Sequence, residues 1–220
     1  MTLTFVLRSM RILAWLALTG TQALAQPAMN LAQARRGLEA PAVPARLAAV
    51  ERLGELGTMA DSPRLMPRLS DADENVRDAA TTSIWQIWGR SGDPAVDALM
   101  ARGLERMRSV RLEEALAVFD EVVRRKPEFA EGWNKRAAVK QLLGRHASAL
   151  RDAAEALQRN PAHFGALASA GHSHLALGDR PRALAAFRGA LTLNPHLGAV
   201  AQAVRELEPR PGPQRRGGGS

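Results

Sequence analysis

Three prolines at equal spacing constrain the fold of this chain more than any other feature of its sequence. Pro127, Pro161 and Pro195 follow one another at intervals of 34 and 34 residues. A proline disfavours the helical conformation in the residue before it, so each of the three is expected to end a helix. If proline is given position 32, the chain divides into three blocks with the same numbering, residues 96–127, 130–161 and 164–195.

Equivalent positions of these blocks carry side chains of similar size. Small residues at positions 8 and 20 let two helices approach closely, and larger residues at positions 4 and 24 fill the space beside them. These positions, with position 27, are Leu99, Trp133, Leu167 (4), Gly103, Ala137, Gly171 (8), Ala115, Ala149, Ala183 (20), Phe119, Ala153, Phe187 (24) and Val122, Ala156, Ala190 (27). The period and the size pattern resemble the tetratricopeptide repeat family, which implies three helical hairpins within residues 94–195.

The turn between the two helices of each predicted hairpin has its own signal. Leu143-Gly144 and Leu177-Gly178 place a glycine where the chain must adopt a left-handed conformation. The first block departs from this pattern, because it carries Ser109-Val110-Arg111 instead.

Residues 29–93 contain a second internal repeat, with an offset of 31 residues. Arg46-Leu47-Ala48-Ala49 aligns with Arg77-Asp78-Ala79-Ala80. This segment resembles short HEAT-like repeats, in which a polar loop such as residues 70–75 precedes the helix. If so, the helix over residues 94–107 serves both arrays, which then fuse without a linker. Residues 196–208 are predicted to form a capping helix, and residues 209–220 a disordered basic tail.

The composition agrees with these repeats. Hydrophobic residues make up 46% of the chain, chiefly alanine and leucine, while aromatic residues make up 4% and hairpin signals such as Asn-Gly are absent. We therefore expect an all-α chain that folds as a right-handed α-solenoid of helical hairpins. The absence of cysteine excludes disulfides, thiolate metal sites and a cysteine nucleophile.

The N-terminus has the parts of a secretory signal. Arg8 and Arg11 precede the apolar stretch 12–20, and Ala23-Leu24-Ala25 supplies the small residues that precede cleavage. We expect residues 1–25 to be removed between Ala25 and Gln26 as a Sec-type signal peptide, which predicts a periplasmic or secreted protein. An uncleaved membrane anchor is the alternative.

The net charge of +8 falls to 8 − 2 = +6 when that segment is removed. The basic residues are spread over the predicted helices rather than clustered with aromatic residues, and an exported protein rarely meets nucleic acid, which we do not expect as a partner. A weak contact of the basic surface and tail with anionic lipid or cell-wall polymer is the alternative function.

The first helix of each block is predicted to line a concave groove through its positions 5, 9 and 12. These candidate peptide-binding residues are Met100, Leu104 and Met107, then Asn134, Ala138 and Gln141 with the neighbouring Lys135, then Ala168, His172 and Leu175. The three residues of the first block are favoured to pack against the preceding helices, which leaves Asn134, Gln141 and His172 as the better ligand contacts. Some family members bind a C-terminal carboxylate with lysine and asparagine here, but Met100 and Leu104 disfavour that ligand.

No catalytic motif, metal site or cofactor site is found in the sequence. His172 and His174 point to nearly opposite faces of a helix and do not chelate one ion. Asp71, Asp73 and Glu74 are interpreted as a helix cap rather than a calcium loop. Trp85 and Trp88 are predicted to pack at a junction between the arrays, rather than to form an exposed anchor, and Trp133 is predicted to be a core residue.

These observations favour an exported scaffold or adaptor that binds a protein or peptide in the concave groove, and not an enzyme. Self-association through the front of the chain is a further alternative.

Overall fold

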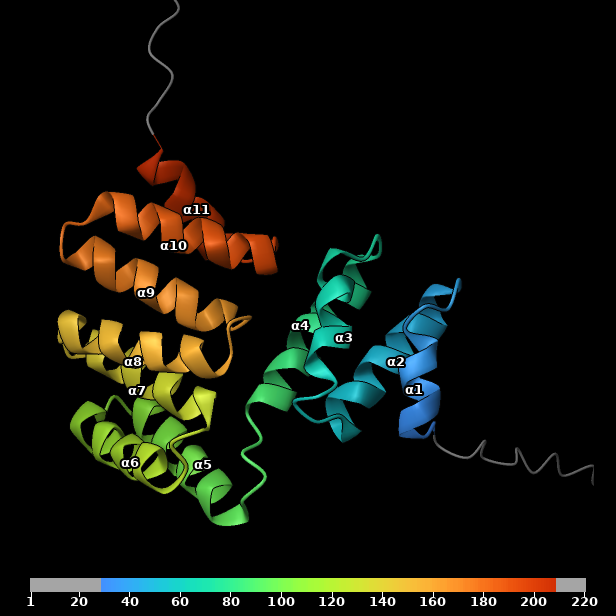
Figure 1. The fold of residues 1–220 in the computed structure, drawn as a ribbon, viewed down its shortest axis with the longest axis horizontal. Helices are drawn as coiled ribbons and strands as arrows, with labels where there is room; N and C mark the ends of the chain where they lie inside the picture. Colours follow the sequence, from blue (N-terminus) through green and yellow to red (C-terminus); the bar gives the residue numbers. More distant parts are fainter. Residues whose placement is uncertain (1–28, 209–220) are drawn as a thin grey trace, which may run out of the picture.

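The computed structural model describes residues 29–208, where the chain forms eleven α-helices, one short 3-10 helix and no strand. The predicted all-α solenoid is confirmed. The helices form two bodies (Figure 1), which we call the front half, α1 to α4, and the array, α5 to α11. The predicted signal peptide with Ala25 and Gln26, and the predicted basic tail, lie outside the described residues. No helix within residues 29–208 is long and apolar enough to cross a bilayer.

The front half consists of α1 (Leu31–Gly37), α2 (Val43–Leu56), α3 (Ser62–Leu65), the 3-10 helix η1 (Met66–Ser70) and α4 (Glu74–Trp88). Helix α2 packs between α1 and α4, and α3 and η1 cover the other side of α4. Apolar side chains from all of these elements are buried among them, including Val50, Leu53, Leu65, Ile84 and Ile87. The front half therefore contributes a core from its own helices.

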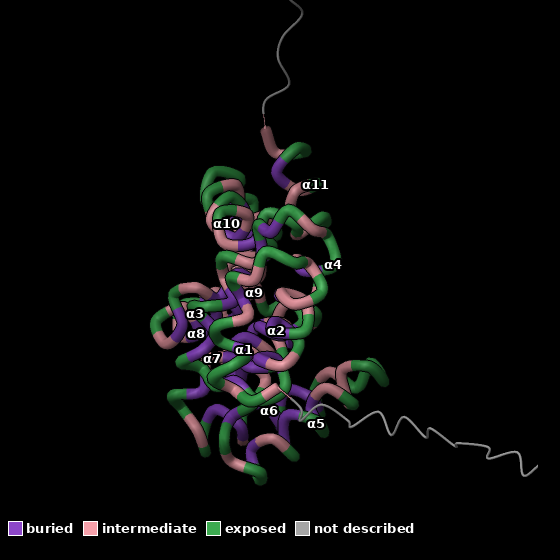
Figure 2. Tube along the Cα trace, turned by 90° about the vertical axis from the view of Figure 1, so that its right-hand side faces the viewer, coloured by how far each residue is buried: buried purple, intermediate pink, exposed green. Residues whose placement is uncertain are grey.

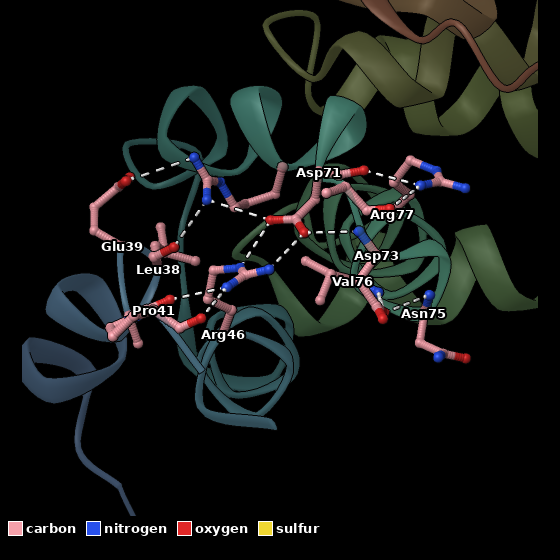
Figure 3. A network of polar contacts seen from close by, with 12 residues as sticks. Leu38, Glu39, Pro41, Arg46, Asp71, Asp73, Asn75, Val76 and Arg77 are labelled. Carbon is pink, nitrogen blue, oxygen red and sulfur yellow. Dashed lines mark hydrogen bonds and ion pairs between the residues drawn. The ribbon is translucent and has the colours of Figure 1, made fainter. Parts of the chain in front are cut away.

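The 31-residue offset corresponds to a repeated polar contact. Arg46 of α2 donates through Nη1 to the carbonyl oxygens of Ala40 and Pro41, both at 3.0 Å. Arg77 of α4 donates in the same way to the carbonyl oxygens of residues 71 and 72, at 2.9 and 3.0 Å (Figure 3). In both helices the arginine fastens the preceding turn, which is why Arg46 and Arg77 align. The likeness of this half to HEAT repeats stays a prediction.

Two aspartates ahead of α4 join its N-terminus to α2. Asp73 Oδ1 accepts hydrogen bonds from the backbone N–H groups of Asn75 and Val76, so the predicted helix cap is confirmed. The buried carboxylate of Asp71 is bound by both Nε and Nη2 of Arg46 at 2.9 Å (Figure 3). These hydrogen bonds from Arg46 hold the pKa of Asp71 below its ordinary value.

The array consists of α5 (Pro94–Arg108), α6 (Leu112–Arg125), α7 (Ala130–Leu142), α8 (His146–Arg159), α9 (Phe164–Ala176), α10 (Arg180–Leu193) and α11 (Gly198–Leu207). The first six pair into three consecutive hairpins that stack in chain order, and α11 packs on α10 (Figure 1). Buried segments lie where helices face one another, while exposed segments lie on the outer sides (Figure 2).

Glycine and phenylalanine make the closest contact inside two of the hairpins. A Cβ atom on Gly103 would lie 2.6 Å from Cζ of Phe119, and one on Gly171 would lie 2.5 Å from the ring of Phe187. Both phenylalanines are fully buried. The predicted pairing of a small residue at position 8 with a large one at position 24 is therefore present, and in the second hairpin two alanines take these positions.

The turns of the three hairpins share one backbone conformation. Gly144 and Gly178 have φ angles of 71° and 80°, and Val110 stands at the equivalent place with φ 56°. A β-branched residue rarely adopts this left-handed conformation, because its Cβ approaches the following carbonyl oxygen. Val110 is also 75% exposed, so no packing of its side chain offsets the strain.

The predicted fusion of the two arrays through residues 94–107 is wrong. Helix α5 packs on α6, whereas α4 packs on α2 and η1. The intervening Gly92 has a φ of 78°, and Asp93 caps a new helix by accepting the N–H groups of Ala95 and Val96. This left-handed turn redirects the chain, so α5 does not continue the stack of the front half.

Candidate functional site

The predicted groove residues of the first hairpin lie in its core. Met100 is buried, and Leu104 and Met107 are partly buried, in a cluster that also contains Phe119 and Val139 and only residues of the array. No residue of the front half belongs to this cluster, so the predicted packing of these three residues against the preceding helices is wrong. Contact of the half-buried Leu104 and Met107 with a ligand stays a prediction.

Gln141 joins two helices instead of facing an open groove. Its Nε2 donates to Ser173 Oγ at 2.7 Å and to the carbonyl oxygen of Ser169. Both acceptors lie on α9, so the amide of Gln141 holds α7 against α9. The Nε2 group of Gln141 is therefore already bound within the array, and contact of Gln141 with a ligand stays a prediction.

Asn134 is also not an open ligand contact, because it is only 5% exposed. Its Nδ2 donates to Glu131 Oε2 at 2.9 Å, while its Oδ1 finds no partner among residues 29–208. A buried acceptor without a hydrogen bond lowers the stability of the fold, so the array is not fully hydrogen-bonded at Asn134.

The remaining predicted residues form a partly exposed strip on α7 and α9. His172 is exposed, and its ring meets the edge of Phe187 at a centroid distance of 4.9 Å. Partial burial lowers the pKa of His172. Ala138, Ala168 and Leu175 are half-buried. We call these four residues the helix-A strip.

Beside this strip, a buried acid–base pair lies at the start of α7 and α9. Glu131 Oε2 and His163 Nε2 are 2.9 Å apart, and Lys135 Nζ is 2.9 Å from Glu131 Oε1. His163 is 0% exposed, and its Nδ1 accepts the N–H of Ala166, so the neutral ring carries its proton on Nε2 and donates it to Glu131. Burial alone would raise the pKa of Glu131, but the hydrogen bond from His163 and the charge of Lys135 together hold that pKa below its ordinary value.

Two tryptophans of α4 cover this pair. Trp88 is 2% exposed and stacks on the ring of His163 at a centroid distance of 4.5 Å. Trp85 meets Phe164 edge-on at 5.1 Å, and Lys135 Nζ lies 5.3 Å from a ring centroid of Trp85. The prediction that both tryptophans pack at a junction is confirmed, but they contact α7 and α9 rather than α5.

The same contact extends along α4 toward the end of the array. A Cβ on Gly165 would lie 2.4 Å from Cη2 of Trp85, and Asn194 Nδ2 donates to Thr81 Oγ1 at 3.4 Å. We call this contact, from the starts of α7 and α9 to the loop before α11, the docking interface. The sequence offered one signal for it, Gly165 at the second residue of a helix, which the repeat pattern does not require.

Trp133 is not the core residue that was predicted. It is half-buried, with the guanidinium carbons of Arg136 and Arg159 each 4.7 Å from a ring centroid. Its Nε1 donates to the carbonyl oxygen of Pro127 at 2.8 Å. Two stacked guanidinium groups, rather than apolar neighbours, thus surround this indole.

Lys135, the last of the predicted groove residues, is half-buried. Its ammonium group forms an ion pair with Glu131 and lies over the ring of Trp85. No three histidine, aspartate or glutamate side chains gather as a metal site within residues 29–208.

Comparison with known proteins shows what the array is similar to. No protein-family model matches the chain. A TPR repeat-containing protein of Rhizobium etli is 34% identical over 80 residues, a match that covers 36% of this chain and 39% of that protein's length. Among solved structures, the Arabidopsis OM64 TPR domain has a TM-score of 0.51 at 22% identity, covering 52% of this chain and 94% of that one.

A second solved structure is the first TPR of Spaghetti (RPAP3) bound to an HSP90 peptide. It has a TM-score of 0.50 at 20% identity and covers 51% of this chain and 89% of that one. At these identities the two solved structures establish the fold. The three hairpins of the array therefore have the fold of TPR domains, and their sequence pattern resembles that of these repeats.

Proposed function

We propose that this protein is an exported interaction scaffold whose array binds a segment of another protein along the helix-A strip. The observation that carries the proposal is the strip itself, where His172, Ala138, Ala168 and Leu175 stay partly exposed on the first helices of adjacent repeats. A partner that covers this mixed apolar and polar surface gains buried area without breaking an existing polar contact. The solved TPR bound to an HSP90 peptide supports peptide binding by this fold.

The strip is smaller than the ten-residue groove expected from the repeats. Gln141, Asn134 and Lys135 are engaged with other side chains, and Met100 of the first hairpin is buried. The proposed site is therefore confined to the second and third repeats.

Affinity capture with the mature chain, residues 26–220, tests this proposal. The variant Ala168→Glu with His172→Glu introduces two carboxylates one helical turn apart on the strip and should reduce the captured partner at least tenfold. Arg151→Glu, on the exposed side of α8, is the matched control and should capture as the original chain does. Equal capture by all three proteins would contradict the strip.

Ionic strength separates this function from the alternative one. Binding along a partly apolar strip should persist at raised salt, whereas contact of basic residues with anionic lipid or cell-wall polymer should fade. Export is a separate part of the proposal, and the mass of the mature N-terminus tests it. A chain that begins at Gln26 supports export, and one that retains residues 1–25 contradicts cleavage.

A further inference from the structure

Helix α4 contacts the array through one narrow face. Thr81, Trp85 and Trp88 are spaced by four and three residues, so they share one side of the helix. Each of them contacts the array: Thr81 contacts Asn194, Trp85 contacts Phe164 and Gly165, and Trp88 contacts His163. The array thus accepts an α-helix that carries two aromatic side chains one turn apart.

The array supplies chemistry that suits such a helix. Phe164 and His163 offer ring faces and edges, Lys135 places its ammonium group over an indole, and Gly165 leaves the space that the Trp85 ring fills. Aromatic pairs and cation–π contacts stabilise such an interface beyond the burial of apolar area. Trp88 is also held by the front half, because its Nε1 donates to Ser62 Oγ at 2.8 Å.

The docking interface is nevertheless less completely packed than the hairpin cores. One cleft of about 170 Å³ lies between Met59, Trp88 and His163, and another of about 330 Å³ lies between Met66, Ala162 and Leu193. Asn160 borders both clefts, and its Nδ2, like Oδ1 of Asn134, lacks a hydrogen-bond partner within the described chain. Clefts and unpaired polar atoms reduce what the interface contributes to stability.

The covalent connection between the two bodies is short. Arg90 donates to the carbonyl oxygens of Gly54 and Gly57 at 2.8 and 2.7 Å, which fastens the end of α4 to α2. On the other side, the N–H of Ser91 donates to Asp97 of α5 at 2.8 Å. Gly92 follows Ser91 in a left-handed conformation, within a turn in which Ser91 Oγ hydrogen-bonds to the backbone of Asp93. The front half and the array are therefore joined at two adjacent residues, Arg90 and Ser91.

We propose that α4 is a displaceable occupant of the array, and that a partner helix with two aromatic side chains three residues apart competes with it for the starts of α7 and α9. The inference rests on the proposed binding function, because it names the kind of segment that the array accepts. It adds a second surface beside the helix-A strip, which becomes available only when the front half moves away.

A peptide copy of α4 tests this directly. The probe is a fluorescent peptide of residues 74–89, added to the mature chain and followed by anisotropy. Trp85→Ala removes the indole that lies on Phe164 and Gly165. Trp85→Lys adds a second positive charge beside Lys135 and should open the interface further. Both opened variants should bind the peptide at least tenfold more tightly than the original chain.

Two further variants assign that binding to the proposed surface. Adding Gly165→Val to either opened variant fills the space for the indole and should return the affinity to that of the original chain. Trp133→Ala removes a tryptophan away from the docking interface and should bind as weakly as the original chain. Circular dichroism confirms that each variant keeps its helices.

Opened variants that keep their helices but do not bind the peptide would overturn the inference, as would binding that ignores Gly165→Val. A dimer of the opened variants in gel filtration would also overturn it, because a second copy would then fill the surface. These outcomes are distinct from failure of the proposed function, in which Ala168→Glu with His172→Glu leaves capture unchanged.

Discussion

A glycine lies against an aromatic ring both inside the third hairpin and in the docking interface, yet the two contacts have different surroundings. Gly171 lies under Phe187, which is fully buried between two helices of one hairpin. Gly165 lies under Trp85, which is half-buried and borders a region with clefts and unpaired amide atoms. The same local geometry is therefore fully buried in the hairpin and partly exposed in the docking interface, which we propose is separable.

We therefore expect the same Gly→Ala substitution to lower the stability of the protein more in the hairpin than in the docking interface. A disturbance within the hairpin lowers the stability of the whole array, because neighbouring repeats stack on it. A disturbance in the docking interface separates the two bodies and leaves each one folded.

The largest effect is expected for Gly171→Ala. The new Cβ would lie 2.5 Å from two ring carbons of Phe187, and a rigid ring between two helices has little room to move. The free energy of unfolding should fall by about 2 kcal/mol in urea denaturation. Gly189→Ala is the control, since its Cβ would meet nothing closer than 3.7 Å, and it should stabilise the protein by about 0.5–1 kcal/mol.

A smaller effect is expected for Gly165→Ala. Its Cβ would lie 2.4 Å from Trp85, but the front half is able to move away, so the array should lose less than about 1 kcal/mol. Tryptophan emission should shift to longer wavelength, because Trp85 and Trp88 become exposed to water. A loss of stability as large as that of Gly171→Ala, without this shift, would show that the interface belongs to a permanent core.

The sequence predicted the hairpins well because their contacts recur within a 34-residue period. Gly103 with Phe119 and Gly171 with Phe187 lie close in the chain, so position and size were sufficient to pair them. The docking interface joins α4 to α9 across more than seventy residues, and no period relates Trp85 to Gly165. The repeat pattern predicts which residues of a helix share a face, but it does not show which of them already form hydrogen bonds with a neighbouring helix or side chain. Gln141 and Asn134 are therefore predicted groove contacts although both amides form hydrogen bonds within the array.

The turns of the hairpins allow a further comparison inside the array, between a strained residue and a relaxed one, with a smaller expected effect. Val110→Gly should stabilise the first hairpin by about 1 kcal/mol, because it removes a left-handed valine whose side chain is exposed. The reciprocal change Gly144→Val, at a site with nothing within 4 Å of the new Cβ, should destabilise the second hairpin by a similar amount. Thermal unfolding measures both, and equal melting temperatures would contradict strain at Val110.

The smallest effect is expected from pH. The pKa of Glu131 is lowered from 4.5, so its carboxylate adds stability that is present above pH 4.5 and is lost as the pH falls through the lower folded value. Asp61 and Asp71 of the front half have lowered pKa values through hydrogen bonds from Arg35 and Arg46, and they act in the same direction. Stability should therefore fall below pH 4.5, and Glu131→Gln should make that fall less steep. An unchanged slope in acid denaturation would contradict this role.

The docking of α4 on the array is tested most directly by a disulfide across the interface. The chain has no cysteine, so Thr81→Cys with Asn194→Cys creates a single pair, at positions where Asn194 Nδ2 lies 3.4 Å from Thr81 Oγ1. Thr82→Cys with Asn194→Cys is the matched control, because Thr82 faces the cleft between α2 and α4. Under mild oxidation we expect the first pair to form an intramolecular bond in most molecules and the control pair to remain reduced. Equal yields in the two proteins, or no bond in the first, would contradict the docked arrangement.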